Sequence, residues 1–333
     1  MHNRREGMKL IGAAVLTALS QRSQADALPP PPAPAKLRLA LIVRTLGTRL
    51  YDAVRDGGLE AAKEFDTIEL VYAGPVNGTA QEQIELVEAM VAQRVEGIMI
   101  SAVDANALLP ACKKALLRGV KVVSFEAPVA PGGRLFHLDP FDAASVGVKG
   151  LQLIAKTLNH EGEVAVLAAA PGQEAAVQRM KEEWVKAEYA KLKLAAVVEA
   201  AETAEATLGA ARDLIAKYSK LKAIVALTPT GTAAAAKAAS GIFVSGIGFP
   251  AALQAAEQAG VVDSFATWNP LDLGYCVTHM LAQIVTGKVT ETSDTSIAAG
   301  RIGEIKLGHD GTAVMGDLMV IDKTNIDQYA KLF

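Results

Sequence analysis

The chain has 333 residues, of which 51% are hydrophobic and 21% are charged. This composition predicts a globular protein with enough apolar residues for the cores of two ordinary domains. The net charge of −3 gives no reason to expect a nucleic acid or an anionic membrane as a partner. Two cysteines supply neither a disulfide framework nor a metal-ligand cluster.

The first 27 residues have the features of an export signal peptide. The basic string RREGMK precedes an apolar stretch at 10–19 that is too short to span a bilayer. Small residues follow, and they predict cleavage after Ala27. The basic string resembles a twin-arginine motif, although Gly7 stands where a large apolar residue is expected. We therefore expect an exported protein, with the general secretory and twin-arginine routes both open.

The next residues, 28–36, are rich in proline and should form an extended tether. Short apolar runs then alternate with segments of helical periodicity, and Thr79 with Glu82 predicts a capping box. Such alternation with short connections indicates a doubly wound parallel sheet. We expect strands at 37–43, 68–73, 97–100 and 121–125, and helices at 51–65, 80–93 and 108–118.

The same alternation restarts after a proline- and glycine-rich segment at 126–140. Two similar α/β halves, with breaks near Glu126 and Asn269, predict two lobes around a cleft. We expect further strands at 163–168, 194–199, 223–227, 242–247, 264–268 and 318–321, and helices at 143–158, within 175–192, and at 204–218, 232–239, 250–259, 271–285 and 325–332.

Glu126 is a lone carboxylate directly after the apolar run 121–125. In open α/β sheets, ligands bind beyond the carboxyl ends of the strands. A carboxylate at this point, followed by a crossover in place of a helix, favours a ligand group at an interdomain hinge. The alternative is a solvated glutamate in a loop.

Several strings in order resemble one known family. They are YAGPVNGTAQEQIELVEAMV, GIMISAVDANALLPACKKALLRGVKVVSFEAPVAPGGR, FATWNPLDLGY, AGRIGEIKLGHDGT and VIDKTNIDQYAKLF. Together they resemble the periplasmic sugar-binding proteins of ABC importers, in the ribose- and galactose-binding superfamily. Within it the chain is most similar to the rhamnose-binding branch, beside the autoinducer-2-binding branch.

The resemblance implies a type I periplasmic binding protein, with two Rossmann-like doubly wound parallel-sheet lobes joined by a three-segment hinge. The N-terminal lobe would comprise 37–125 plus 269–298, and the C-terminal lobe 126–268 plus 299–333. This arrangement places Cys112 and Cys276 on helices at opposite faces of one sheet. A disulfide needs Cα atoms within about 7 Å, so we expect two free thiols.

The resemblance also assigns ligand residues in the N-terminal lobe. It matches Arg44 to a cationic or polar contact, the alternative being a surface arginine. It matches Leu50 and Tyr51 to the pair that packs on the sugar ring, the alternative for Tyr51 being a core tyrosine. Glu126 stands where relatives carry an aspartate that accepts from two hydroxyls. The extra methylene of Glu126 leaves the identity of the sugar open.

In the C-terminal lobe, Arg179 matches an arginine of the ribose-binding pattern, the alternative being an exposed helix charge. Thr228 replaces an amide or acidic contact. Gly248 replaces an acidic residue and leaves Phe249 nearby, which makes this wall less polar and suits the methyl group of a deoxysugar. The alanines at 175–176 depart from the autoinducer-2 pattern.

At the second break, Trp268 and Asn269 end a strand, and an amide suits a pair of hydroxyls. The alternative for Asn269 is a turn residue before a proline. Asp272 reads better as a structural residue at a helix start than as a ligand contact. Asp139 and His137 lie just past the first break, and His137 is better explained as a satisfied structural histidine.

Other function classes fit the sequence less well. An enzyme would need a nucleophile with its base or a metal constellation, and the sequence offers neither motif. A sugar-responsive repressor would need a helix-turn-helix before the first strand. We therefore expect a monomeric periplasmic solute-binding protein that uses no cofactor or metal. It would bind a small neutral sugar, rhamnose or another deoxyhexose, by hinge closure and deliver it to a membrane permease. The alternative is an autoinducer-2 or polyol receptor for signalling or chemotaxis.

Overall fold

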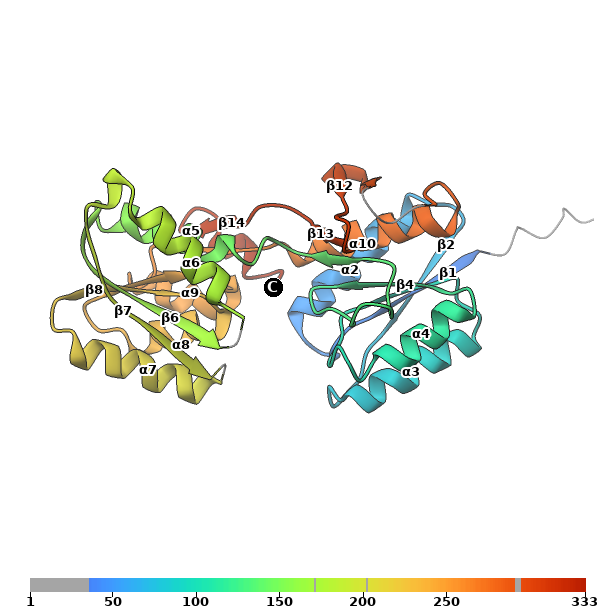
Figure 1. The fold of residues 1–333 in the computed structure, drawn as a ribbon, viewed down its shortest axis with the longest axis horizontal. Helices are drawn as coiled ribbons and strands as arrows, with labels where there is room; N and C mark the ends of the chain where they lie inside the picture. Colours follow the sequence, from blue (N-terminus) through green and yellow to red (C-terminus); the bar gives the residue numbers. More distant parts are fainter. Residues whose placement is uncertain (1–35, 171, 202, 291–294) are drawn as a thin grey trace, which may run out of the picture. The chain divides into compact units, whose positions relative to one another are not determined.

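The computed structural model describes residues 36–170, 172–201, 203–290 and 295–333. The expected export signal and the tether up to residue 35 lie outside these described residues. The described chain builds two parallel β-sheets, each with helices on both faces (Figure 1). The expected fold class, an α/β protein with doubly wound parallel sheets, is confirmed.

Within the described residues, the first sheet has the strand order β13-β5-β4-β3-β1-β2, and every neighbouring pair is parallel. Its register pairs Ile42 with both Ala73 and Ile100, and Ile100 with Ser124. The carboxyl ends of the central strands therefore meet at one edge. The strands are β1 (Leu37–Ile42), β2 (Ile68–Ala73), β3 (Gly97–Ile100), β4 (Lys121–Phe125), β5 (His137–Asp139) and β13 (Thr312–Val314).

Both faces of this sheet are buried, because side chains along a strand point alternately to opposite faces. Leu39 and Leu41 enter one core with helices α2 (Arg49–Lys63) and α10 (Pro270–Val285). Ala40 and Ile42 enter the other core with α3 (Ala80–Ala92) and α4 (Leu109–Leu117). Figure 1 shows the two helix pairs on opposite sides of the sheet.

The two cysteines follow this division. Cys276 lies in the core under α2 and α10, and Cys112 lies in the core under α3 and α4. Both are buried free thiols. The expected placement on opposite faces of one sheet is confirmed.

Two helices of the first sheet, α2 and α3, begin where a threonine side chain accepts from one of the first backbone N–H groups. Thr48 caps α2 by accepting from the backbone N–H of Tyr51 at 3.4 Å. Thr79 caps α3, and Glu82 completes the capping box that the sequence predicts. These caps fix the starts of α2 and α3, each of which follows a strand of the first sheet.

Helices α2 and α10 cross at glycines. A Cβ on Gly274 would lie 1.8 Å from the Val54 carbonyl oxygen, and a Cβ on Gly57 would lie 1.8 Å from the Leu271 oxygen. Only glycine permits this approach of the two backbones. The close crossing therefore fixes the position of α2, which carries Tyr51, against α10.

Within the described residues, the second sheet has the order β7-β6-β8-β9, and a bridge from Ile247 to Ala266 adds the antiparallel pair β10-β14. Its core residues also divide between two faces. The strands are β6 (Glu161–Ala170), β7 (Lys191–Ala201), β8 (Leu221–Ala226), β9 (Phe243–Gly246), β10 (Ser264–Thr267) and β14 (Met319–Asp322). The helices are α5 (Ser145–Thr157), α6 (Glu174–Trp184), α7 (Ala204–Lys217), α8 (Pro229–Ala238), α9 (Pro250–Gln258) and α11 (Ile326–Tyr329).

Some short elements were not anticipated from the sequence. Strands of three residues carry no readable alternation, and their pairing depends on neighbours that are distant in the chain. Besides β5 and β13, these elements are β11 (Ser296–Ala298), β12 (Glu304–Lys306), and the 3₁₀ helices η2 (Ala187–Tyr189) and η3 (Gly300–Ile302).

Strands β5 and β13 bear on the expected lobe boundaries. Both pair within the first sheet, whereas the sequence assigned 137–139 and 312–314 to the C-terminal lobe. The chain leaves the first sheet after Asp139 and after Val314, in place of the expected positions near Glu126 and residue 298. Between β10 and α10 the chain passes through Trp268 and Asn269.

Candidate functional site

A polar cluster lies at the carboxyl edge of the first sheet, with Glu126 at its centre. Glu126 directly follows β4, Arg44 lies two residues beyond β1, and Ser101 directly follows β3. Tyr51 reaches the same point from the first turn of α2. The parallel register brings these strand ends together, so residues far apart in the chain surround one carboxylate.

The two carboxylate oxygens of Glu126 have different environments. Oε2 accepts a hydrogen bond from the Tyr51 hydroxyl at 3.1 Å and a second from the Ser101 hydroxyl. Oε1 lies 3.8 Å from Nη1 of Arg44, and no hydrogen bond reaches it from the described residues. The cluster thus presents one held oxygen and one oxygen with unused acceptor capacity, beside a cation.

Glu126 is held in an unusual backbone conformation. Its φ is 59°, in the left-handed region that residues other than glycine seldom adopt. Such strain persists only where surrounding contacts determine it, and it is frequent at ligand sites. The Glu126 N–H donates to the Leu138 carbonyl at 3.0 Å, so β5 helps to hold this conformation.

The Tyr51 phenol is a firm donor. Its burial, followed by the Glu126 carboxylate, raises the pKa of Tyr51 far above its ordinary value. The hydroxyl therefore keeps its proton and can donate to Oε2 throughout the neutral range. Leu50, beside it on α2, packs against the core on the same face of the sheet.

Other expected site residues form separate groups. On α6, Arg179 forms an ion pair with Asp142, and the two side chains are about half exposed. Thr228 is buried and caps α8, accepting from the Gly231 N–H at 3.0 Å. Both polar groups therefore have partners within the protein.

An aromatic group surrounds Trp268, at the end of β10. The Trp268 ring lies 4.8 Å from Phe249 edge-to-face and 5.2 Å from Phe141, measured between ring centroids. Its Nε1 is buried and has no hydrogen-bond partner among the described residues. A Cβ on Gly248 would lie 2.4 Å from Cδ1 of Leu253, so a side chain here would require this leucine to shift. Phe141, Phe249 and Trp268 thus form one aromatic group, and its role as a wall of the ligand site stays a prediction.

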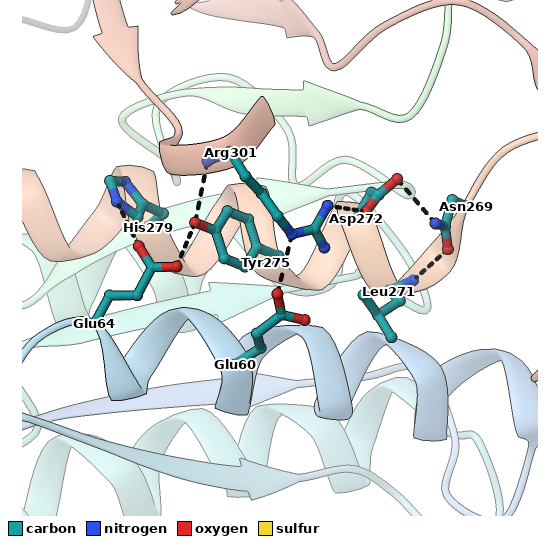
Figure 2. Close-up of polar contacts among 8 residues, drawn as sticks. All are labelled: Glu60, Glu64, Asn269, Leu271, Asp272, Tyr275, His279 and Arg301. Atoms are coloured by element: carbon teal, nitrogen blue, oxygen red, sulfur yellow. Dashed lines mark hydrogen bonds and ion pairs between the residues drawn. The ribbon is translucent and has the colours of Figure 1, made fainter. Parts of the chain in front are cut away.

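Asn269 and Asp272 belong to a network between α2, α10 and η3 (Figure 2). Asn269 Oδ1 accepts from the Leu271 N–H at 3.1 Å, and its Nδ2 donates to Asp272 at 2.8 Å. Asp272 also pairs with Arg301, at 2.5 Å. The Asn269 amide thus caps the start of α10. These contacts are those of a structural residue before Pro270, which was the alternative to a ligand contact.

Asp139 and His137 form a further pair. His137 is buried, with Nδ1 2.9 Å from the Ser124 hydroxyl and Nε2 3.1 Å from Asp139 Oδ1. Both ring nitrogens therefore have partners, which agrees with the structural role expected for His137. Asp139 is the partner that holds this ring.

The structure thus joins Arg44, Tyr51 and Glu126 directly, and it adds Ser101, which the sequence analysis missed. Ser101 follows a predicted strand, so the strand-end rule that selected Glu126 also applied to it. Among the described residues, no group of three or more His, Cys, Asp or Glu side chains is placed to hold a metal ion. None of the described helices is both long enough and apolar enough to cross a bilayer.

Two doubly wound sheets with a polar cluster at the strand ends define a type I periplasmic binding protein. A family model described as "Periplasmic binding protein domain" matches residues 39–289, and the chain belongs to this family.

One relative and two solved structures illustrate the similarity. The D-ribose/D-allose-binding protein of Pseudomonas aeruginosa is 31% identical over 173 residues, which are 48% of this chain and 52% of that protein. The match thus spans about half the length of that relative. A sugar ABC transporter structure from Actinomyces odontolyticus has a TM-score of 0.78 and 27% identity, covering 88% of this chain and 97% of that one. A solute-binding protein from Clostridium phytofermentas with bound L-rhamnose has a TM-score of 0.70 and 24% identity, covering 90% and 99%, and it shares the fold.

Proposed function

We propose that this protein is the periplasmic sugar-binding component of an ABC importer and that it binds a small neutral monosaccharide at the Glu126 cluster. The observation that carries the proposal is the unequal use of the Glu126 carboxylate. Two protein hydroxyls hold Oε2, while Oε1 keeps its acceptor capacity beside the Arg44 guanidinium. A sugar hydroxyl is a donor that this oxygen can accept from.

The charges of the cluster favour a neutral ligand. Arg44 and Glu126 carry opposite charges 3.8 Å apart, so the pair has no net charge to attract an anion or a cation. A polyol can accept from the guanidinium and donate to the carboxylate at once. Tyr51 is only 5% exposed and packs in the core, so the half-buried Leu50 beside it would meet the C–H side of a sugar.

The particular sugar we propose is L-rhamnose or another deoxyhexose. Phe141, Phe249 and Trp268 form an apolar group. Such a wall can contact the methyl group of a deoxysugar at little cost, whereas a protein carboxylate facing that methyl group would be left without a hydrogen-bond partner. Arg179, Thr228 and Trp268 of the C-terminal lobe, together with Asn269 at the crossing between the lobes, would supply the remaining contacts. The bound L-rhamnose of one structural neighbour is consistent with this choice.

The mechanism we propose is hinge closure. A sugar that contacts both lobes binds the closed form more tightly than the open form, so binding shifts the population toward closure. The membrane permease would then recognise the closed form. Delivery in the periplasm requires export, for which residues 1–27 would serve as the signal.

Isothermal titration of the purified protein tests the proposal. The panel would contain L-rhamnose, L-fucose, D-allose, D-ribose, L-arabinose and autoinducer-2. We expect saturable binding of at least one neutral monosaccharide, with the deoxyhexoses tightest. If no sugar binds and a charged or non-sugar solute does, the ligand class is wrong. If a pentose or D-allose binds better than both deoxyhexoses, the class stands and the choice of rhamnose is wrong.

A further inference from the structure

Gln83, on α3, is a fully buried polar side chain next to the Glu126 cluster. Its exposed fraction is 0%, whereas its helix otherwise buries apolar residues such as Val87 and Met90. A buried amide is costly unless its donors and acceptor are satisfied. The contacts of Gln83 show which groups satisfy it.

Every hydrogen bond of the Gln83 amide goes to the backbone at the strand ends. Its Nε2 donates to the Val43 carbonyl at 3.2 Å and to the Ser101 carbonyl at 2.7 Å. Its Oε1 accepts from the Val103 N–H at 2.8 Å. One side chain from α3 therefore links the chain after β1 to the chain after β3.

These backbone groups lie just past the last paired residues of the two strands. The register between β1 and β3 ends at Ile42 and Ile100, and the Ser101 N–H donates to the Ile42 carbonyl at 3.0 Å. Beyond that point β1 and β3 are no longer hydrogen-bonded to each other, and the Val43 and Ser101 carbonyls accept from Gln83 instead. The amide thus continues the link between the strands by one further step.

The linked residues carry the candidate site. Arg44 follows Val43 in the chain, and the Ser101 hydroxyl donates to Glu126 Oε2. We infer that Gln83 is a positioning residue, which sets the separation between the Arg44 and Ser101 backbones and so the place of the Glu126 carboxylate. This inference rests on the proposed sugar-binding function, and it assigns Gln83 no contact with the sugar.

The substitution Gln83→Met tests the inference, because methionine has a similar length and no amide. Two buried carbonyls would lose their donor and would turn toward other partners, moving both strand ends. We expect the affinity for the monosaccharide of the titration panel that the wild type binds best to fall about 10-fold or more.

A matched control separates positioning from general destabilisation. Val87 lies one helical turn further along the same face of α3 and is fully buried, but it packs in the apolar core. Val87→Ala should lower the thermal midpoint and leave the affinity within about 2-fold of wild type. Circular dichroism would confirm that both variants are folded at the temperature of titration.

A double-mutant cycle with Ser101→Ala supplies a measurement that a merely structural role would not change. If Gln83 acts through the position of Ser101, the penalty of Gln83→Met should shrink to less than about 3-fold when Ser101 is already alanine. The Val87→Ala effect should be the same in both backgrounds. If Gln83→Met does not fold, Gln83→Glu replaces it, because glutamate keeps the acceptor for Val103 and loses both donors to the carbonyls.

The possible outcomes are distinct. A wild-type protein that binds none of the monosaccharides in the titration panel overturns the proposed function and the inference together. A wild type that binds, with Gln83→Met no weaker than Val87→Ala, overturns the inference alone. A full Gln83→Met penalty that persists beside Ser101→Ala also overturns it, because Gln83 would then act by another route.

Discussion

The Tyr51 hydroxyl donates to Glu126 Oε2 over 3.1 Å and so connects helix α2 to the end of strand β4. These residues are separated by 75 positions in the chain. Ser101 donates to the same oxygen from the end of β3. Because two hydroxyls already donate to Oε2, we propose that the sugar donates to Oε1.

Substituting Glu126 should weaken sugar binding. We expect Glu126→Ala to cost ~2–4 kcal/mol of binding free energy, because sugar hydroxyls would lose a charged acceptor. Titration calorimetry measures the change. Glu161→Ala, at a side chain that is 72% exposed, is the control and should bind as the wild type does. An unaltered affinity in Glu126→Ala would remove this residue from the site.

Tyr51 should make stability depend on alkaline pH. Its pKa is raised above the ordinary 10.0, chiefly by burial. Above about pH 10 the unfolded chain therefore loses this proton while the folded chain keeps it, and the free energy of unfolding falls as the pH rises. Tyr51→Phe should show a shallower decline between pH 10 and about pH 12 in urea titrations. Equal slopes for the two proteins would contradict the buried, protonated phenol.

Arg301 should stabilise the contact between η3 and the α2–α10 pair. Its guanidinium lies 3.0 Å from Glu60, pairs with Asp272, and stacks 4.3 Å from the centroid of the Tyr275 ring (Figure 2). Arg301→Ala should lower the free energy of unfolding by about 1–2 kcal/mol, because partly exposed ion pairs contribute little and the stacking adds to them. Arg212→Ala, on an exposed part of α7, is the control and should change stability by less than about 0.5 kcal/mol. A loss no larger than that of the control would show that the network contributes nothing measurable.

Two glycine-to-alanine substitutions in helices should have opposite effects. At Gly274 the new Cβ would lie 1.8 Å from the Val54 oxygen, so Gly274→Ala should cost more than about 3 kcal/mol or prevent folding. At Gly209, in α7, a Cβ would meet nothing within 4 Å, and alanine should stabilise the helix by about 0.5–1 kcal/mol. Urea denaturation measures both. A stable Gly274→Ala variant would mean that α2 and α10 do not approach this closely.

Cys112 and Cys276 should be unreactive in the folded protein. Both are buried, and burial raises the pKa of each thiol to about 12, so the reactive thiolate is scarce at neutral pH. A chromogenic disulfide reagent should label neither residue at pH 8 in the native state and both in denaturant. Fewer than two labelled thiols in denatured, unreduced protein would reveal a disulfide and contradict the assignment of the cysteines to opposite faces of the sheet.

The alternation of strands and helices and the strand-end position of Glu126 follow from the sequence itself. Apolar runs such as LRLALI and the periodicity between them are local signals, and they predicted the core strands and most helices of both sheets. The placement of the two cysteines came from the sheet order that the family resemblance implied, whereas the same local logic placed the Thr79–Glu82 capping box. The three-residue strands β5 and β13 escaped it, because their partners are remote in the chain.

The hydrogen-bond network of the candidate site was decided only by the tertiary structure. The sequence marked Arg44, Tyr51 and Glu126 one by one, yet it did not show that Tyr51 and Ser101 share one oxygen of Glu126 or that Gln83 ties two strand ends together. Nor did it show that the Asn269 amide is occupied by Asp272 and the start of α10. Periodicity reports which face of an element is apolar, whereas a hydrogen bond depends on register, helix crossing and rotamer. Those quantities exist only once the chain is packed.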